Sequence, residues 1–143
     1  MPRRKKSTVA QEVEKAAKLL QRLVRLKASD DNGYCNCVTC GKLDHYKSMQ
    51  GGHFIPRGRT VFKLFEENIH PQCPSCNLWG MKQAHYVLRY RQYMVDTYGE
   101  RRVKAMERLA WRASPKFKRE EVIQFARDTK EQIKEQEWRI GEM

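Results

Sequence analysis

The sequence lacks any run of apolar residues close to the roughly 18 that a membrane-spanning helix needs. It also lacks an apolar stretch behind the basic residues at its start, so we expect no secretory signal, no membrane partner and a cytoplasmic protein. Cysteine occurs an odd number of times, five. In a reducing compartment such a set favours metal ligation over disulfides. A length of 143 residues suits one compact domain overall, with a modest core.

Acidic residues are scarce relative to basic ones, 17 against 29, for a net charge of +12. The surplus is uneven. Residues 1–27 carry nine basic and two acidic side chains, and residues 82–119 carry eleven and three. Residues 28–81 carry five of each, and residues 120–143 have a net charge of −3. Basic flanks attract a polyanion by releasing its condensed counterions. We therefore expect DNA as the partner, with a solubilising surface as the alternative interpretation.

Helical periodicity flanks a middle segment that lacks it. Residues 1–7 are expected to form a disordered basic arm, with Arg3, Arg4, Lys5 and Lys6 as candidate DNA contacts. Residues 8–28 predict an amphipathic helix, and residues 83–143 a helical region interrupted at Gly99 and restarting near Ser114-Pro115. Residues 29–82 form the middle module. Because this module holds short stretches of strand character, the predicted fold class is α+β, mostly helical.

Two stretches of the middle module have strand character. The first is "GHFIP", and the second is "TVFKLF", which follows the turn-like "RGR". Together they predict a hairpin with a basic loop. Arg57 and Arg59 in that loop are candidate phosphate contacts, with a solvated turn as the alternative.

The sequence contains two Cys-x-x-Cys knuckles, "CVTC" with Cys37 and Cys40, and "CPSC" with Cys73 and Cys76. There are 32 residues between Cys40 and Cys73. Two intervening residues let both thiolates of a knuckle reach one ion, and four thiolates complete a tetrahedron. We therefore predict a structural zinc site without an open position. Cys35 is the spare cysteine; it could replace Cys37, but only Cys37 keeps the two-residue spacing.

A histidine and two asparagines follow in a fixed order. His53 lies in "GGHFIPR", Asn68 in "ENIHPQC", and Asn77 directly after the second knuckle. This order resembles the signature of the His-Asn-His (ββα-metal) endonucleases, in which "His-hydrophobic-hydrophobic-Pro" is followed by "Asn-x-x-x-x-Cys-x-x-Cys-Asn". The resemblance implies a zinc-stabilised ββα-metal module that hydrolyses phosphodiesters and leaves 5′-phosphate ends.

The resemblance also implies a role for each residue. His53 would be the general base, since an imidazole with a pKa of about 6.5 can deprotonate water at neutral pH. Asn77 would hold the catalytic ion, magnesium or manganese, and Asn68 would tie the loop together and orient the base. Many relatives place Asp immediately before the base, where this chain has Gly52. The shell of the ion could then be completed by another residue: Asp44, His45, Glu66, Glu67 or His85.

The segments "GYCNCVTCGK", "GGHFIPR", "ENIHPQCPSCNLWG" and "YMVDTYG" resemble a narrower group, the Rap (NinG) recombination nucleases of lambda-like bacteriophages. That family also has Gly before the histidine. The resemblance implies a structure-selective endonuclease acting on branched recombination intermediates such as D-loops and Holliday junctions. It is the only source of the expected preference for branches.

Two alternatives stay open: a zinc-dependent DNA-binding protein without catalysis, and an endonuclease that cuts linear duplex. A homodimer is expected because a four-way junction has approximate two-fold symmetry, and paired cuts need two active sites. The predicted pairing surface is the apolar seam of the 8–28 helix, with Val13, Ala16, Leu20 and Leu23 at coiled-coil spacing. One alternative surface is the acidic last helix, which could lie against a basic flank of the partner chain. The other alternative is that both helices cover the core of their own chain.

Overall fold

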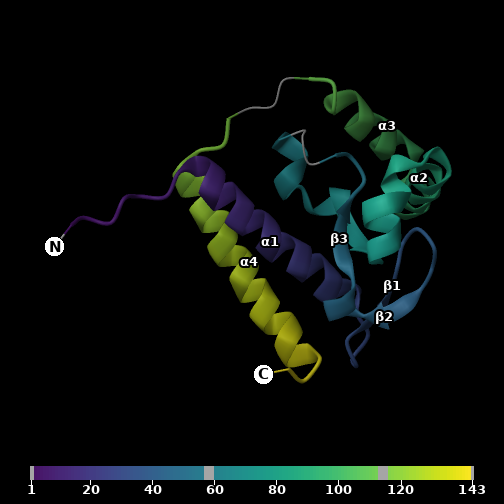
Figure 1. Ribbon diagram of the computed structural model, residues 1–143, viewed down its shortest axis with the longest axis horizontal. Helices are drawn as coiled ribbons and strands as arrows, with labels where there is room; N and C mark the ends of the chain where they lie inside the picture. The colour runs from purple at the N-terminus through teal and green to yellow at the C-terminus, as the bar shows by residue number, and fades with distance from the viewer. Residues whose placement is uncertain (1, 57–59, 113–115, 143) are drawn as a thin grey trace.

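The computed structural model describes residues 2–56, 60–112 and 116–142. Helices dominate the fold: α1 (Val9–Ala28), α2 (Ala84–Tyr98), α3 (Glu100–Leu109) and α4 (Arg119–Arg139). The chain between α1 and α2 forms two antiparallel two-stranded sheets (Figure 1). One pairs β1 (Tyr34–Asn36) with β2 (Leu43–His45), and the other pairs β3 (Gln50–His53) with β4 (Ile69–Gln72). The predicted class, α+β and mostly helical, is confirmed. None of the described helices is long and apolar enough to cross a membrane.

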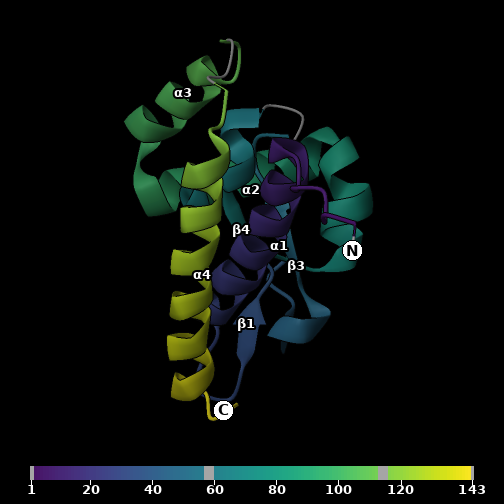
Figure 2. The ribbon, with the colours of Figure 1, turned by 90° about the vertical axis from the view of Figure 1, so that its left-hand side faces the viewer.

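Helices α1 and α4 lie side by side and run in the same direction (Figure 2). Arg119, at the start of α4, donates a hydrogen bond to the carbonyl oxygen of Ser7. Arg139, at the end of α4, donates to the carbonyl oxygen of Leu26. Thr8 caps α1 through a capping box, which explains why the helix begins at the next residue. Two segments far apart in the sequence thus form one helical pair.

The apolar seam of α1 is buried within its own chain. All four seam residues are at most 5 % exposed: Val13, Ala16, Leu20 and Leu23. Val13 and Ala16 pack against Val122 and Ala126 of α4. The prediction that this seam joins two copies is therefore wrong, because the apolar face of α4 already covers it.

The strand that pairs with β3 also differs from the prediction. "TVFKLF" contributes the 3-10 helix η2 (Thr60–Leu64), while His53 lies opposite Ile69 in the β3–β4 pairing. Phe62 of η2 is buried in a core formed with α2 and α3, and a helical turn delivers it there. All four positions of β4 are buried, and the strand contains Pro71, a residue that argues against a strand when it lies inside a run.

After β4 the chain makes two tight turns, the π-helix η4 (Ser75–Trp79) and the 3-10 helix η5 (Gly80–Lys82). Helix α2 follows and stops at Gly99, as predicted, where a φ of 88° favours glycine. Helices α2 and α3 share a core with η2 and with the residues that follow β3; its members include Phe54, Phe62, Tyr90, Met94, Val103 and Met106. The predicted restart at Ser114-Pro115 lies outside the described residues, and α4 begins at Arg119.

Candidate metal centre and active site

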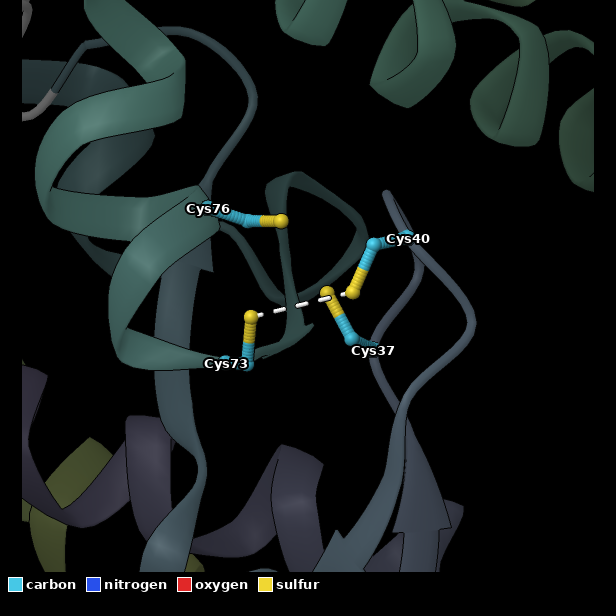
Figure 3. A group of neighbouring side chains, drawn as sticks. All are labelled: Cys37, Cys40, Cys73 and Cys76. Carbon is cyan, nitrogen blue, oxygen red and sulfur yellow. Dashed lines mark hydrogen bonds between the residues drawn. The ribbon is translucent and has the colours of Figure 1, made fainter.

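The two knuckles come together in space. Cys37 and Cys40 follow β1, Cys73 and Cys76 follow β4, and Figure 3 shows the two pairs facing each other. The four Sγ atoms all lie within 4.8 Å of one another, and Cys40 Sγ is 3.8 Å from Cys73 Sγ. A tetrahedron with zinc–sulfur bonds of about 2.3 Å has sulfur–sulfur edges of about 3.8 Å. The cluster therefore fits a metal ion such as zinc.

Of the two neighbouring cysteines Cys35 and Cys37, it is Cys37 that lies in the group of four. Burial raises the pKa of the Cys37 thiol, but backbone N–H groups of Cys40, Cys73 and Thr39 outweigh it and bring the pKa down to about 7. Burial raises the pKa of the Cys35 thiol. Cys35 is buried in β1, outside the group of four. Position decides for Cys37, because burial also raises the pKa of Cys40 and Cys76, which belong to the group of four.

His53 and Asn77 line the same pocket, a hollow of about 450 Å³. His53 ends β3, whereas Asn77 belongs to η4, which starts just after the second knuckle's first cysteine. The backbone N–H of Asn77 donates to the carbonyl oxygen of Cys73. The four-cysteine cluster and the β3–β4 pair thereby hold His53 and Asn77 close together, although they are 24 positions apart in the sequence.

Gln50 orients Asn77, which sequence reasoning missed. The Nδ2 of Asn77 donates to Gln50 Oε1 at 2.7 Å. The oxygen Oδ1 is therefore the atom of Asn77 that remains to coordinate an ion. Nothing in the sequence marks Gln50, because glutamine at the start of a strand is an ordinary surface choice and only the β3–η4 approach gives it a partner.

Asn68 is fully buried and ties together the two ends of the loop that follows β3. Its Oδ1 accepts from the Ile55 N–H at 2.8 Å, and its Nδ2 donates to the carbonyl oxygens of Ile55 at 3.0 Å and Phe62 at 3.4 Å. The backbone carbonyl oxygen of Asn68 accepts a hydrogen bond from the N–H of Phe54, the neighbour of His53. Asn68 acts on His53 through the backbone.

The residues considered for completing the ion's shell lie elsewhere. Among the described residues that line the pocket there is no carboxylate and no histidine other than His53. The other candidates have partners of their own or are exposed on α2: Asp44 with Lys42, His45 with Glu142, Glu66 with Lys27, Glu67 with Arg102, and His85 against Tyr86. The prediction that one of them joins Asn77 has no support in this geometry.

The chain matches a protein-family model, described as the bacteriophage lambda NinG protein, over residues 2–138. The chain belongs to this family. No curated protein and no solved structure matches it. The match to the NinG family spans the chain from the residues before α1 almost to the end of α4, so the knuckles and the pocket both lie within it.

In this NinG-family chain a buried polar network, which the sequence did not reveal, supports β3, the strand that carries His53. The Tyr90 hydroxyl donates to the carbonyl oxygen of Gly52 at 2.7 Å. His70 Nδ1 is 3.0 Å from the Tyr90 hydroxyl, and His70 Nε2 is 2.7 Å from the Tyr98 hydroxyl. All three hydrogen bonds form together when His70 Nδ1 carries the proton and donates to Tyr90, while Nε2 accepts from the Tyr98 hydroxyl. Burial lowers the pKa of His70 to about 4, so the ring stays neutral.

The candidate DNA contacts have different outcomes. Arg3, Arg4, Lys5 and Lys6 are exposed in a segment without helix or strand that precedes α1 (Figure 1). Arg57 and Arg59 lie outside the described residues. Lys82, which sequence reasoning did not single out, lines the pocket beside His53 and Asn77.

Proposed function

We propose that this NinG-family protein is a metal-dependent DNA endonuclease that hydrolyses phosphodiesters in branched recombination intermediates, within the cytoplasm of the bacterial host. The observation that carries the proposal is the shared pocket of His53 and Asn77, a base and an oxygen ligand brought together beside the four-cysteine cluster. The net charge of +12 supports a nucleic-acid substrate.

Each side chain has a distinct task in this proposal. His53 accepts the proton of the attacking water, and Asn68 holds the strand end that carries it. Asn77 Oδ1, oriented by Gln50, holds magnesium or manganese, which when bound offsets the charge on the phosphate and on the departing 3′ oxygen. Lys82 attracts the phosphate from the rim of the pocket. The zinc at the knuckles keeps the parts in register without taking part in the chemistry.

The proposed preference for D-loops and Holliday junctions rests on the NinG resemblance. Symmetric cutting of a junction needs two active sites, so we propose a homodimer on branched DNA. Its interface is not the seam of α1, which α4 covers. Sedimentation at micromolar protein, with and without a four-way junction, tests this part separately.

A DNA-binding protein without catalysis is the second candidate. It is favoured by the pocket having no carboxylate among its described lining residues, and by Gly52 at the position before the histidine. Incubation of zinc-loaded protein with matched linear, forked and four-way DNAs, each with and without magnesium or manganese, separates the candidates. The proposal predicts metal-dependent cuts near the branch that leave 5′ phosphates. Cuts on linear duplex at the same rate would remove the branch preference, and binding without cuts would leave the second candidate.

A further inference from the structure

Two large apolar side chains are exposed directly after Asn77. Leu78 is 54 % exposed and Trp79 is 69 % exposed. The ammonium group of Lys82 lies 5.7 Å from the centre of the Trp79 ring, and both Leu78 and Lys82 line the pocket of His53. Trp111 and Trp138 are more exposed than Trp79, so exposure alone marks no site. The position of Trp79, between Leu78 and Lys82 of a pocket that holds a candidate base, suggests a contact surface.

The backbone beneath Trp79 is held on both sides. Trp79 ends the π-helical turn η4, and the N–H of Gly80 donates back to the carbonyl oxygen of Cys76, a knuckle cysteine. A side chain at Gly80 would begin 2.9 Å from the ring of Tyr86, so this turn rests directly on α2. The indole is exposed, but its point of attachment is fixed, which lowers the entropy cost of binding a ligand.

We propose that Trp79 is a stacking platform for an unpaired base next to the scissile phosphate. The inference rests on the proposed function for the position of that phosphate. In a continuous duplex both faces of a base pair are covered by its neighbours. An indole can stack only where a base has lost a neighbour, at a branch, a gap or a single strand. Trp79 thereby gives the site a means of distinguishing branched from linear DNA that requires no reading of sequence.

The charge around Trp79 favours nucleic acid over a protein partner. Lys82 stands over the indole, and Arg89 lies 5.7 Å from the ring of Tyr86, the residue on which the turn rests. The segment from 82 to 119 carries eleven basic and three acidic side chains. Alternating aromatic and basic side chains are the pattern of surfaces that bind single strands, where rings stack on bases and cations contact phosphates.

Binding measurements in a His53→Ala protein test the inference without cleavage. Trp79→Ala should weaken binding to a fork with single-stranded arms by about 5- to 150-fold, the range that loss of one base–aromatic stack gives, and leave binding to a blunt duplex of the same sequence unchanged. Trp79→Phe should retain most of the affinity for the fork. Trp138→Ala is the matched control, since Trp138 is 76 % exposed at the far end of α4.

Fluorescence gives a direct readout, because the chain has three tryptophans. With Trp111→Phe and Trp138→Phe, Trp79 is the sole indole, and the fork should quench it while the blunt duplex does not. Equal loss of affinity for both DNAs, or no quenching by the fork, would overturn the inference. A fluorescence change that depends on protein concentration without DNA would instead make the surface a contact between copies. Quenching in a protein that never cuts would uphold the stacking role and refute only the nuclease.

Discussion

The side-chain oxygen of Gln72 fills the space in which any side chain at position 52 would begin. An ideal Cβ on Gly52 would lie 1.7 Å from Gln72 Oε1. Gln72 cannot easily withdraw, since it is fully buried and its Nε2 donates to Thr39 Oγ1 at 2.8 Å, within the first knuckle. The amide of Gln72 thus leaves no room for a side chain at position 52, which explains why this chain has glycine before His53.

A Gly52→Asp substitution should therefore destabilise the fold by about 1–3 kcal/mol, the usual cost of overpacking a closed site. Truncation of its neighbour should relieve the strain, so Gly52→Asp should cost less in a Gln72→Ala background. Denaturant unfolding of the four proteins of this cycle measures the coupling, expected at about 0.5–3 kcal/mol. Strictly additive costs would show that the two positions do not compete for space.

The protein should bind one zinc per chain. Replacing Cys37, Cys40, Cys73 or Cys76 with serine should remove the metal and lower the unfolding temperature, because ligand binding here contributes to folding. Cys35→Ser is the matched control, a buried thiol outside the cluster, and should keep the metal. Elemental analysis checks the first statement; a folded preparation without zinc would refute it.

The four-cysteine cluster was the part of the molecule most accessible from sequence, because the two-residue spacing of the knuckles is a local requirement of tetrahedral ligation. The choice of Cys37 over Cys35 followed from the same spacing. The order of His53, Asn68 and Asn77 was also visible, but the sequence carried no sign of Gln50 or Gln72. Those two act only through contacts between elements that pairing brings together.

The errors have physical causes. "TVFKLF" has the composition of a strand, yet tertiary packing places Phe62 in the core through a 3-10 turn. The true partner, β4, is only four residues long and contains Pro71, and proline inside a short run argues against a strand. For α1, the periodicity correctly predicted a helix with one apolar face, but periodicity cannot distinguish a partner copy from α4 of the same chain.

Acid should weaken the fold through His70. Its pKa is about 4 in the folded protein against 6.5 as the ordinary value, and burial is the cause. Between these values the unfolded chain binds a proton that the folded chain does not, so the free energy of unfolding falls as pH drops from 6.5 to 4. The loss is on the order of 3 kcal/mol, at about 1.4 kcal/mol per pH unit.

Comparison with His70→Gln isolates this contribution. Burial raises the pKa of two facing groups, Tyr90 and Tyr98, so neither titrates in this range, and protonation of the knuckle thiolates affects both proteins alike. The wild-type free energy of unfolding, measured by denaturant titration at several pH values, should fall more steeply than that of the variant. Parallel profiles would mean that His70 is not the group responsible.

The residues before α1 should contribute to DNA affinity through charge alone. Replacing Arg3, Arg4, Lys5 and Lys6 with glutamine should weaken binding to any DNA and flatten the dependence of log affinity on log salt by up to about four units, at roughly 0.9 per phosphate contact. Lys130→Gln with Lys134→Gln removes two exposed charges from α4 as a control. An unchanged salt slope would assign these residues another role.

Cleavage by His53→Ala protein tests whether His53 is the general base. Removal of a general base usually costs about a hundred- to ten-thousand-fold in rate, while DNA binding should change little because the base acts in the transition state. Asn77→Ala should lose activity as well but regain part of it at higher magnesium or manganese, since it weakens the ion's binding. The decisive measurement is the single-turnover rate on a four-way junction, with binding and zinc content measured on the same preparation. The account predicts that His53→Ala binds zinc and junction normally and cuts at least a hundredfold more slowly; a His53→Ala protein that cuts at the wild-type rate would contradict it.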